Sequence, residues 1–382
     1  MQQPLRAACD LRHNYVTEGA AETSKILGIE LLRFASALAV LVFHYQHFAF
    51  IGTTQQNFVA SDQPLYPWLS LFYNQGFYGV EVFWCISGFI FFWKYGRAIA
   101  DNHLGGFVFF VLRLSRLYPL HFATLLFMAA MQLVYFSMHG NYFVYHYNDP
   151  YHFALQLFMA SNWGFQAGDS FNGPIWSISI EVIVYAVFFL LLRYLSGSAW
   201  LVATLALVAA AVQVLKVSAH PLFTCLMFFF LGCLTAIVYE SANKRARART
   251  WISVASVLAV LTLIVTSLFV AIKAKYFLII FSPALIFLCV THVPESRLAS
   301  KILIPAGNVT YASYLLHVPI QIAVVSYCDY THTAIPFFNP AFFLSFIGFT
   351  LLLSHWTYEW FEMPAQRVIR RKLLPTLRGA SG

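Results

Sequence analysis

Long apolar runs separated by short polar segments dominate this chain. Ten of them have about the 20 residues that a helix needs to cross a bilayer. They lie near residues 30–50, 77–94, 108–136, 175–195, 199–217, 221–240, 251–271, 276–293, 304–326 and 338–360. An eleventh, shorter run extends from Phe153 to Trp163. The pattern predicts an all-α fold, a polytopic membrane helix bundle.

The positions of the basic residues predict which loops face the cytoplasm. Cytoplasmic loops of membrane proteins carry an excess of Lys and Arg. The loops 51–76, 137–174 and 327–337 contain neither residue, so we expect them outside. The basic segments expected inside are Lys25, Lys94 with Arg97, Lys244 to Arg249, Arg297 with Lys301, and Arg367 to Lys372.

This orientation decides how the short eleventh run is read. Going from 137–174 outside to 244–249 inside takes an odd number of crossings, and the runs starting at 175, 199 and 221 already supply three. The run 153–163 is therefore predicted to be re-entrant or to lie on the outer interface. We expect about ten transmembrane helices with both termini cytoplasmic. Three lysines, left outside by this topology, are exceptions to the rule: Lys216, Lys273 and Lys275.

Composition supports the membrane class and narrows the domain organisation. The chain is 60% hydrophobic and 10% charged over 382 residues, whereas soluble domains carry about 25% charged residues. Its net charge of +8 comes from short loop clusters, so it does not indicate nucleic-acid binding. We expect a cytoplasmic N-terminal tail (1–27), one transmembrane domain (28–365) and a basic cytoplasmic C-terminal tail (366–382). The six cysteines show no metal-binding or disulfide spacing, and we expect no metal.

Two ionisable residues, Arg33 and His44, lie eleven positions apart in the first apolar run. Eleven residues make almost three helical turns, so both side chains share one face, roughly 16 Å apart along the axis. An Arg at the centre of a membrane helix costs about 2.5–3.5 kcal/mol on an insertion scale. A functional pair is therefore favoured over the alternative that Arg33 extends to the inner interface while His44 is a satisfied core histidine.

Two carboxylates, Glu81 and Glu181, and a second histidine lie in other predicted spans, and a third carboxylate, Glu362, lies just beyond the last one. Glu181 falls about two turns into the membrane from the outer side, where it should pair with another group. His317 reaches a similar depth and is its predicted partner. Glu81 is a supporting residue or an ordinary interfacial carboxylate, and Glu362 either stabilises a helix end or balances nearby arginines. The adjacent Ser87-Gly88 is predicted to be a close helix-packing point.

A pair of arginines, Arg113 and Arg116, begins the third span on one helix face at the cytoplasmic side. Such residues often only anchor a helix at the inner interface. Together with Arg33 they would instead form a basic cluster, and the planar guanidinium suits phosphate oxygens. The arginines on the inner side could hold a polyphosphate ligand, and a neutral histidine with carboxylates further out could carry out acid–base chemistry. This division fits acyl transfer from a cytoplasmic thioester to an external alcohol.

Six segments in order resemble acyltransferase family 3, the integral-membrane O-acyltransferases that modify bacterial glycans. The resemblance runs from about Gly28 to Arg367. The segments are Arg33-x10-His44, GVEVFWCISGF at 79–89, RLSRLYP at 113–119, PIWSISIE at Pro174 to Glu181, the SYLLH run ending at His317, and E-x-P at Glu362 to Pro364. Glu81 stands where the family usually has Asp, a change that keeps the charge.

The resemblance implies a ten-helix enzyme that uses acyl-CoA, usually acetyl-CoA, as a donor substrate and holds no permanent cofactor. His44 and Arg33 would match the family's essential histidine and arginine, and we add Glu181 as a catalytic carboxylate. Arg113 and Arg116 would match the arginine pair linked to donor binding, together with Arg33 and Tyr118. The residues expected in supporting roles are Glu81, Ser177, His317 and Glu362.

The same resemblance suggests an acceptor and a location. The acceptor would be a hydroxyl of an exported or lipid-linked glycan, such as exopolysaccharide or O-antigen, at the bacterial inner membrane. Partners would be membrane lipid and the polysaccharide synthesis or export machinery. We expect no fused esterase-like domain, so acceptor recognition would fall to the bundle and its outer loops. The aromatic stretch Tyr142 to Tyr151 either stacks on a sugar or forms an interfacial belt.

A transporter with a buried ionic pathway is the alternative function. Two features count against it: the halves of the chain show no matching broken helices, and the arginines gather on one side.

Overall fold

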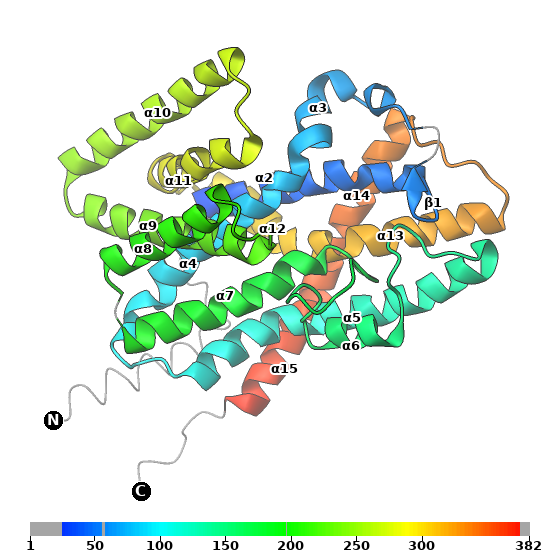
Figure 1. Cartoon of the computed structure of the whole chain (residues 1–382), viewed down its shortest axis with the longest axis horizontal. Coiled ribbons are helices and arrows are strands. Elements are labelled where there is room, and N and C mark those ends of the chain that lie inside the picture. Colours follow the sequence, from blue (N-terminus) through cyan, green and yellow to red (C-terminus); the bar gives the residue numbers. More distant parts are fainter. Residues whose placement is uncertain (1–24, 56–57, 196, 375–382) are drawn as a thin grey trace, which may run out of the picture.

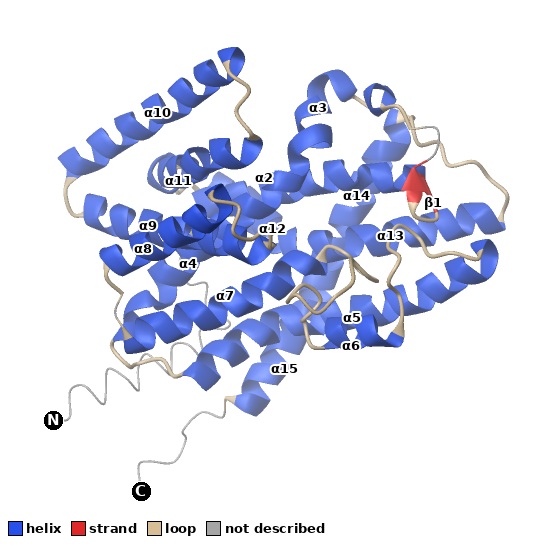
Figure 2. Ribbon diagram, in the orientation of Figure 1, coloured by secondary structure: helices blue, strands red, loops and turns tan. Residues whose placement is uncertain are grey.

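The computed structural model describes residues 25–55, 58–195 and 197–374, and most of these are helical (Figures 1 and 2). The α-helices are α2 Leu27–His44, α3 Tyr66–Gln75, α4 Gly79–Ala100, α5 Gly106–His139, α6 Pro150–Leu157, α7 Ile175–Tyr194, α8 Ala199–Val214, α9 Pro221–Asn243, α10 Ala246–Phe269, α11 Ala274–His292, α12 Arg297–Asn308, α13 Thr310–Tyr330, α14 Pro340–Thr357 and α15 Met363–Leu373. Short 3-10 segments lie at Tyr45–Ala49 (η1), Ala60–Asp62 (η2) and Gly76–Tyr78 (η3), and a π-helical turn, η4, covers Tyr358–Glu362. The two strands, β1 Phe50–Ile51 and β2 Thr54–Gln55, form one antiparallel hairpin.

The predicted class, a polytopic helix bundle, is confirmed. Within the described ranges, eight helical segments are long and apolar enough to span a membrane. A ninth span results if α12 and α13, which bend by 46° relative to each other, are counted together. The one predicted span that remains, 199–217, corresponds to α8. This helix is apolar but has only 16 residues, about 24 Å of helix. It packs along α9.

The run 153–163 does not form a spanning helix. Its only regular part is α6, eight residues long. The last turn of α6 is bonded to the middle of α5, because Tyr118 donates its hydroxyl hydrogen to the Leu157 carbonyl (3.1 Å) and His121 Nε2 lies 2.7 Å from the Gln156 carbonyl. The chain then turns back to begin α7. This agrees with the prediction that the run does not cross the bilayer.

Two glycines set the closest helix contact in the bundle, between α4 and α9. A Cβ atom on Gly88 would lie 1.8 Å from the Phe229 carbonyl oxygen, and one on Gly232 would lie 1.9 Å from that of Cys85. Neither position has room for a side chain, so the two backbones touch directly. The predicted packing point at Ser87-Gly88 is therefore confirmed, and it fixes the depth of the helix that carries Ser87.

Helix α2 lies inside the bundle and contacts α4, α11, α12 and α13. We call the end of the bundle that holds Arg33 the inner end, and the end that holds His44 the outer end. Around α4, α7 and α9 the core is rich in fully buried phenylalanines. They include Phe89, Phe109, Phe188, Phe228, Phe229 and Phe230. A second apolar cluster surrounds Tyr45 at the outer end, between α2, α13 and α14.

A proline in α13 connects this helix to the start of α7. Pro319 has no N–H, so the carbonyl of Leu315, four residues earlier, loses its helical donor. The buried side chain of Asn172 supplies the missing hydrogen bond at 2.9 Å. Because Asn172 directly precedes α7, this bond holds Ser177 and Glu181 against α13.

The predicted domain boundary at 365/366 falls inside α15, which begins at Met363 and ends at Leu373. The helix packs against α5, and Leu374 after it is 6% exposed. The first part of the predicted C-terminal tail is therefore a helix packed against the bundle. The remainder of both predicted tails, 1–24 and 375–382, lies outside the described residues.

Candidate functional site

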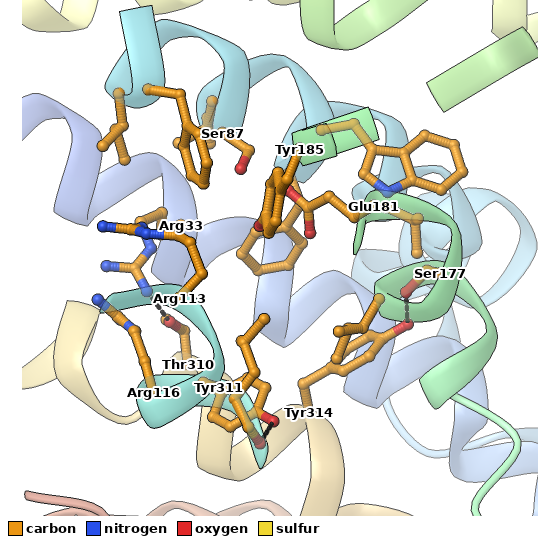
Figure 3. A pocket seen from close by; sticks show the side chains of 18 residues that line it. Arg33, Ser87, Arg113, Arg116, Ser177, Glu181, Tyr185, Thr310, Tyr311 and Tyr314 are labelled. Carbon is orange, nitrogen blue, oxygen red and sulfur yellow. Dashed lines mark hydrogen bonds between the residues drawn. The ribbon is translucent and has the colours of Figure 1, made fainter. Parts of the chain in front are cut away.

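A cavity of about 160 Å³ opens between α2, α4, α5, α7 and α13 towards the inner end of the bundle. Its charged lining has two sides, which Figure 3 shows: the guanidinium groups of Arg33, Arg113 and Arg116 gather on one side, and Glu181 reaches in from the other. Tyrosine and serine hydroxyls complete the polar lining at Ser87, Ser177, Tyr185, Tyr311 and Tyr314. The three predicted donor-binding arginines are thus brought together from two helices.

Arg33 is fixed from two directions. Glu30, one turn earlier on α2, accepts a hydrogen bond from one terminal nitrogen at 3.1 Å, and Thr310 on α13 accepts one from the other at 3.0 Å. Glu30 fits there because Gly307 has no side chain: a Cβ atom would lie 1.6 Å from the Glu30 carboxylate. Sequence reasoning missed Glu30, although its position three residues before Arg33 on a helix was a usable signal.

Arg113 is held by aromatic rings rather than by a carboxylate. Its guanidinium lies 4.6 Å from the ring centre of Phe91 and 4.7 Å from that of Tyr95, and it donates a hydrogen bond to the Tyr95 hydroxyl. Such stacking is typical of Arg and holds its flat group in one plane. Within the described part of the chain, the buried Nε of Arg113 has no hydrogen-bond partner.

Arg116 faces the predicted supporting residue Glu362 across the cavity's inner edge. Glu362 is 7% exposed, lies at the end of the π-helical turn η4, and interacts electrostatically with Arg116 and Arg33. This favours the reading in which Glu362 balances the arginines.

Glu181 does not pair with His317, so that prediction is wrong. The polar neighbours of the Glu181 carboxylate are the side chains of Ser87 and Tyr185. Tyr314 occupies the turn of α13 that faces this part of α7, and it shares a 2.7 Å hydrogen bond with Ser177. His317, one turn further, points instead toward α2. Because α7 and α13 run in opposite directions from the Ser177–Tyr314 contact, Glu181 lies one turn nearer the inner end and His317 one turn nearer the outer end. The similar depth expected for the two residues is therefore also wrong.

His317 lies against the other histidine of the predicted site, His44. Nδ1 of His44 and Nε2 of His317 are 3.1 Å apart, and the two rings stack with centres separated by 4.9 Å. Nδ1 of His317 lies 3.2 Å from the Ser313 carbonyl oxygen. On the opposite side, Gln321 donates a hydrogen bond to the His44 carbonyl at 2.8 Å.

These contacts show that Arg33 and His44 do face one neighbour. Arg33 meets Thr310 and His44 meets His317, both on α13. The shared face predicted from their spacing is thus the face packed against α13. His44 does not line the cavity, but Tyr314 does, and its ring centre is 6.1 Å from that of His317. A line of side chains therefore joins the cavity to the histidine pair.

A third histidine, His47, extends this group outwards. Its ring centre is 4.9 Å from that of His44, and its Nδ1 lies 3.2 Å from the Gln321 side-chain oxygen. Tyr145, from the aromatic outer stretch, contacts the His47 ring edge-on at 6.1 Å. In the ranges that the structure describes, no three His, Cys, Asp or Glu side chains are arranged to hold a metal ion.

Two further predicted site residues, Tyr118 and Glu81, are also absent from the cavity lining. The Tyr118 hydroxyl bonds the end of α6, and its assignment to donor binding stays a prediction. The tyrosine that lines the cavity beside Leu117 is Tyr311, which donates a hydrogen bond to the Leu117 carbonyl. Glu81 is 4% exposed and does not line the cavity, although its neighbours Val80 and Phe83 do.

The fold and this site define a membrane helix bundle with a charged cavity buried among its helices. A family model described as an acyltransferase domain matches residues 26–359, which is most of the chain. The protein belongs to this acyltransferase family, as its six sequence motifs indicated. No curated protein and no solved structure matches the chain.

Proposed function

We propose that this acyltransferase moves an acyl group, expected to be acetyl, from cytoplasmic acyl-CoA to a hydroxyl of an exported or lipid-linked glycan. One observation carries the proposal: a basic cavity and a stacked histidine pair lie along the same two helices, α2 and α13, and Tyr314 joins them. Arginines suit the phosphates of the donor, and a histidine suits proton transfer from an alcohol.

The hydrogen bonds around His317 determine which nitrogen of His44 can act as the base. The Ser313 carbonyl can only accept, so Nδ1 of His317 carries a hydrogen, and in the neutral ring Nε2 then holds a lone pair. Nδ1 of His44 must therefore donate to His317. The lone pair of His44 lies on Nε2, which is left to take a proton from the acceptor.

The reaction then balances without a further reagent. His44 Nε2 removes the proton from the acceptor hydroxyl while the oxygen attacks the thioester carbonyl carbon. The C–S bond breaks as the new C–O ester bond is completed, and the thiolate of CoA receives the proton from His44. Arg33, fixed by Glu30 and Thr310, would hold the donor in the cavity. The acceptor would approach His44 from the outer end, where Tyr145 lies.

A transfer assay on purified protein tests this function. We expect wild-type protein to release CoA from acetyl-CoA and to acetylate glycan, and His44→Ala to lose about 100-fold or more in kcat, the usual range for a general base. His355→Ala is the matched control, because His355 is exposed on α14. A His44→Ala protein that folds normally and keeps full activity contradicts the role of His44. Absence of CoA release from the wild type would favour the transporter alternative.

A further inference from the structure

Four basic side chains from three helices surround Tyr95 at the inner end of the bundle. Lys94 lies 5.8 Å from the Tyr95 ring centre, and Arg113 stacks on the same ring and bonds its hydroxyl. From α15, Arg370 donates a hydrogen bond to the Ser115 hydroxyl at 3.1 Å and another to the Leu112 carbonyl at 3.3 Å. We call Lys94, Arg113, Arg116 and Arg370 the inner basic cluster.

The charges facing Arg370 are mainly of its own sign. Its electrostatic neighbours are Arg113, Arg116 and the hydroxyl of Tyr95. The carboxylates on this side of the bundle interact with other arginines: Glu30 is bound to Arg33, Glu362 interacts with Arg116 and Arg33, and Glu181 with Arg113 and Arg33. None of them is an electrostatic neighbour of Arg370. Like charges brought together in a half-buried place repel one another, and a bound anion removes that cost.

The geometry of the cluster is that of a prepared anion site. The Nε of Arg113 is buried without a hydrogen-bond partner among the described residues. Arg370 is held by one edge of its guanidinium, through Nε and one terminal nitrogen, against α5. The remaining terminal nitrogen keeps hydrogens to donate. Because Leu112 and Ser115 immediately flank Arg113 and Arg116, this free edge is presented beside the cavity's arginines.

We propose that Arg370 on α15, with Lys94, Arg113 and Arg116, forms a binding site for the phosphate groups of a nucleotide-bearing thioester donor. The inference rests on the proposed function. In acyl-CoA the phosphates lie at the opposite end of the molecule from the thioester, so the cluster would hold the phosphates while the thioester arm extends through the cavity towards Tyr314. Helix α15 is then a part of the donor site.

The test separates the phosphates from the thioester. Initial rates are measured for wild type and Arg370→Gln with two donors, acetyl-CoA and acetyl-pantetheine, which has the same thioester arm but no nucleotide phosphates. We expect Arg370→Gln to raise KM for acetyl-CoA about tenfold, the effect of losing one charge-assisted hydrogen bond. With acetyl-pantetheine we expect no change. Arg371→Gln is the matched control, since the neighbouring Arg371 is exposed.

The outcomes distinguish three explanations. Equal losses with both donors would mean that Arg370 only docks α15 onto α5, and an unchanged KM for acetyl-CoA would mean that it does not contact the donor; either result overturns the proposal. Wild-type protein that uses neither donor would overturn the proposed function itself. If Arg370→Gln does not fold, Arg370→Lys is used instead, because it keeps the positive charge but loses the planar set of guanidinium hydrogen-bond donors. The same selective rise in KM then supports the site, and equal KM values overturn it.

Discussion

At the residue scale, the contact between His44 and His317 fixes the orientation of the buried His44 ring. A single buried histidine can adopt either tautomer, and only one of them leaves Nε2 free to accept a proton. The backbone carbonyl of Ser313 selects the tautomer of His317, and His317 in turn selects that of His44. Under the proposed function, His317 would therefore be a positioning residue, because it would act through His44.

This role predicts how the two histidines combine. His317→Ala should lower kcat by about 100-fold, close to the effect of His44→Ala, while the KM for donor stays near the wild-type value. Because both residues support one proton transfer, the double variant should lose little more than either single variant. Steady-state kinetics on the three purified variants checks this. Losses that multiply in the double variant would show that the residues act independently.

Sequence reasoning at this scale found residue types and faces but not partners. The eleven-residue spacing correctly placed Arg33 and His44 on one face, because the helix repeat is fixed by the backbone. It paired His317 with Glu181, which the structure contradicts. The error arises because the partner of a side chain depends on how helices shift, rotate and pack against each other, which a single helix repeat does not contain.

At the element scale, the bundle depends on the direct contact of α4 with α9. We predict that Gly232→Ala strongly destabilises the protein, because its Cβ would lie 1.9 Å from the Cys85 carbonyl, a backbone atom that cannot move alone. Overpacking of this kind costs about 1–3 kcal/mol or more. The measurement is thermal unfolding in detergent. Gly348→Ala is the control, since nothing lies within 4 Å of a Cβ there, and equal melting temperatures for both variants would contradict the prediction.

Most elements could be predicted from hydropathy, and the exceptions share a physical reason. An apolar run marks a membrane span because a helix needs about 20 apolar residues to cross the hydrocarbon core of the bilayer. Such runs carry no information on bends, so the 46° break between α12 and α13 was not anticipated. The basic segment 366–374 was predicted to be a tail because its charges suit water. In the structure Arg370 turns towards α5, where hydroxyl and carbonyl groups accept its hydrogen bonds.

At the scale of the whole molecule, one contact agrees with the relative helix directions that the ten-crossing topology requires. Lys275 is an exception to that rule, because the topology leaves it outside. In the structure it donates a hydrogen bond to Gln213 at 2.6 Å and interacts electrostatically with Glu81. The end of α8 and the starts of α4 and α11 therefore lie at the same end of the bundle. This is the arrangement that the ten-crossing topology requires, with α8 counted as a crossing.

The orientation itself predicts which positions a membrane-impermeant thiol reagent reaches. Tyr151→Cys, in the loop without basic residues, should be labelled in intact cells, whereas Lys244→Cys should be labelled only after the membrane is permeabilised. Both side chains are exposed in the structure, with Tyr151 at 55%, so burial does not confuse the comparison.

The parent chain is the control for labelling of its own cysteines, three of which (Cys85, Cys225 and Cys233) are buried. Labelling of Lys244→Cys in intact cells would show that the bundle has the opposite orientation in the membrane. The inner basic cluster would then face away from the compartment that holds acyl-CoA, and the proposed division between a donor side at Arg33 and an acceptor side at His44 would fail with it.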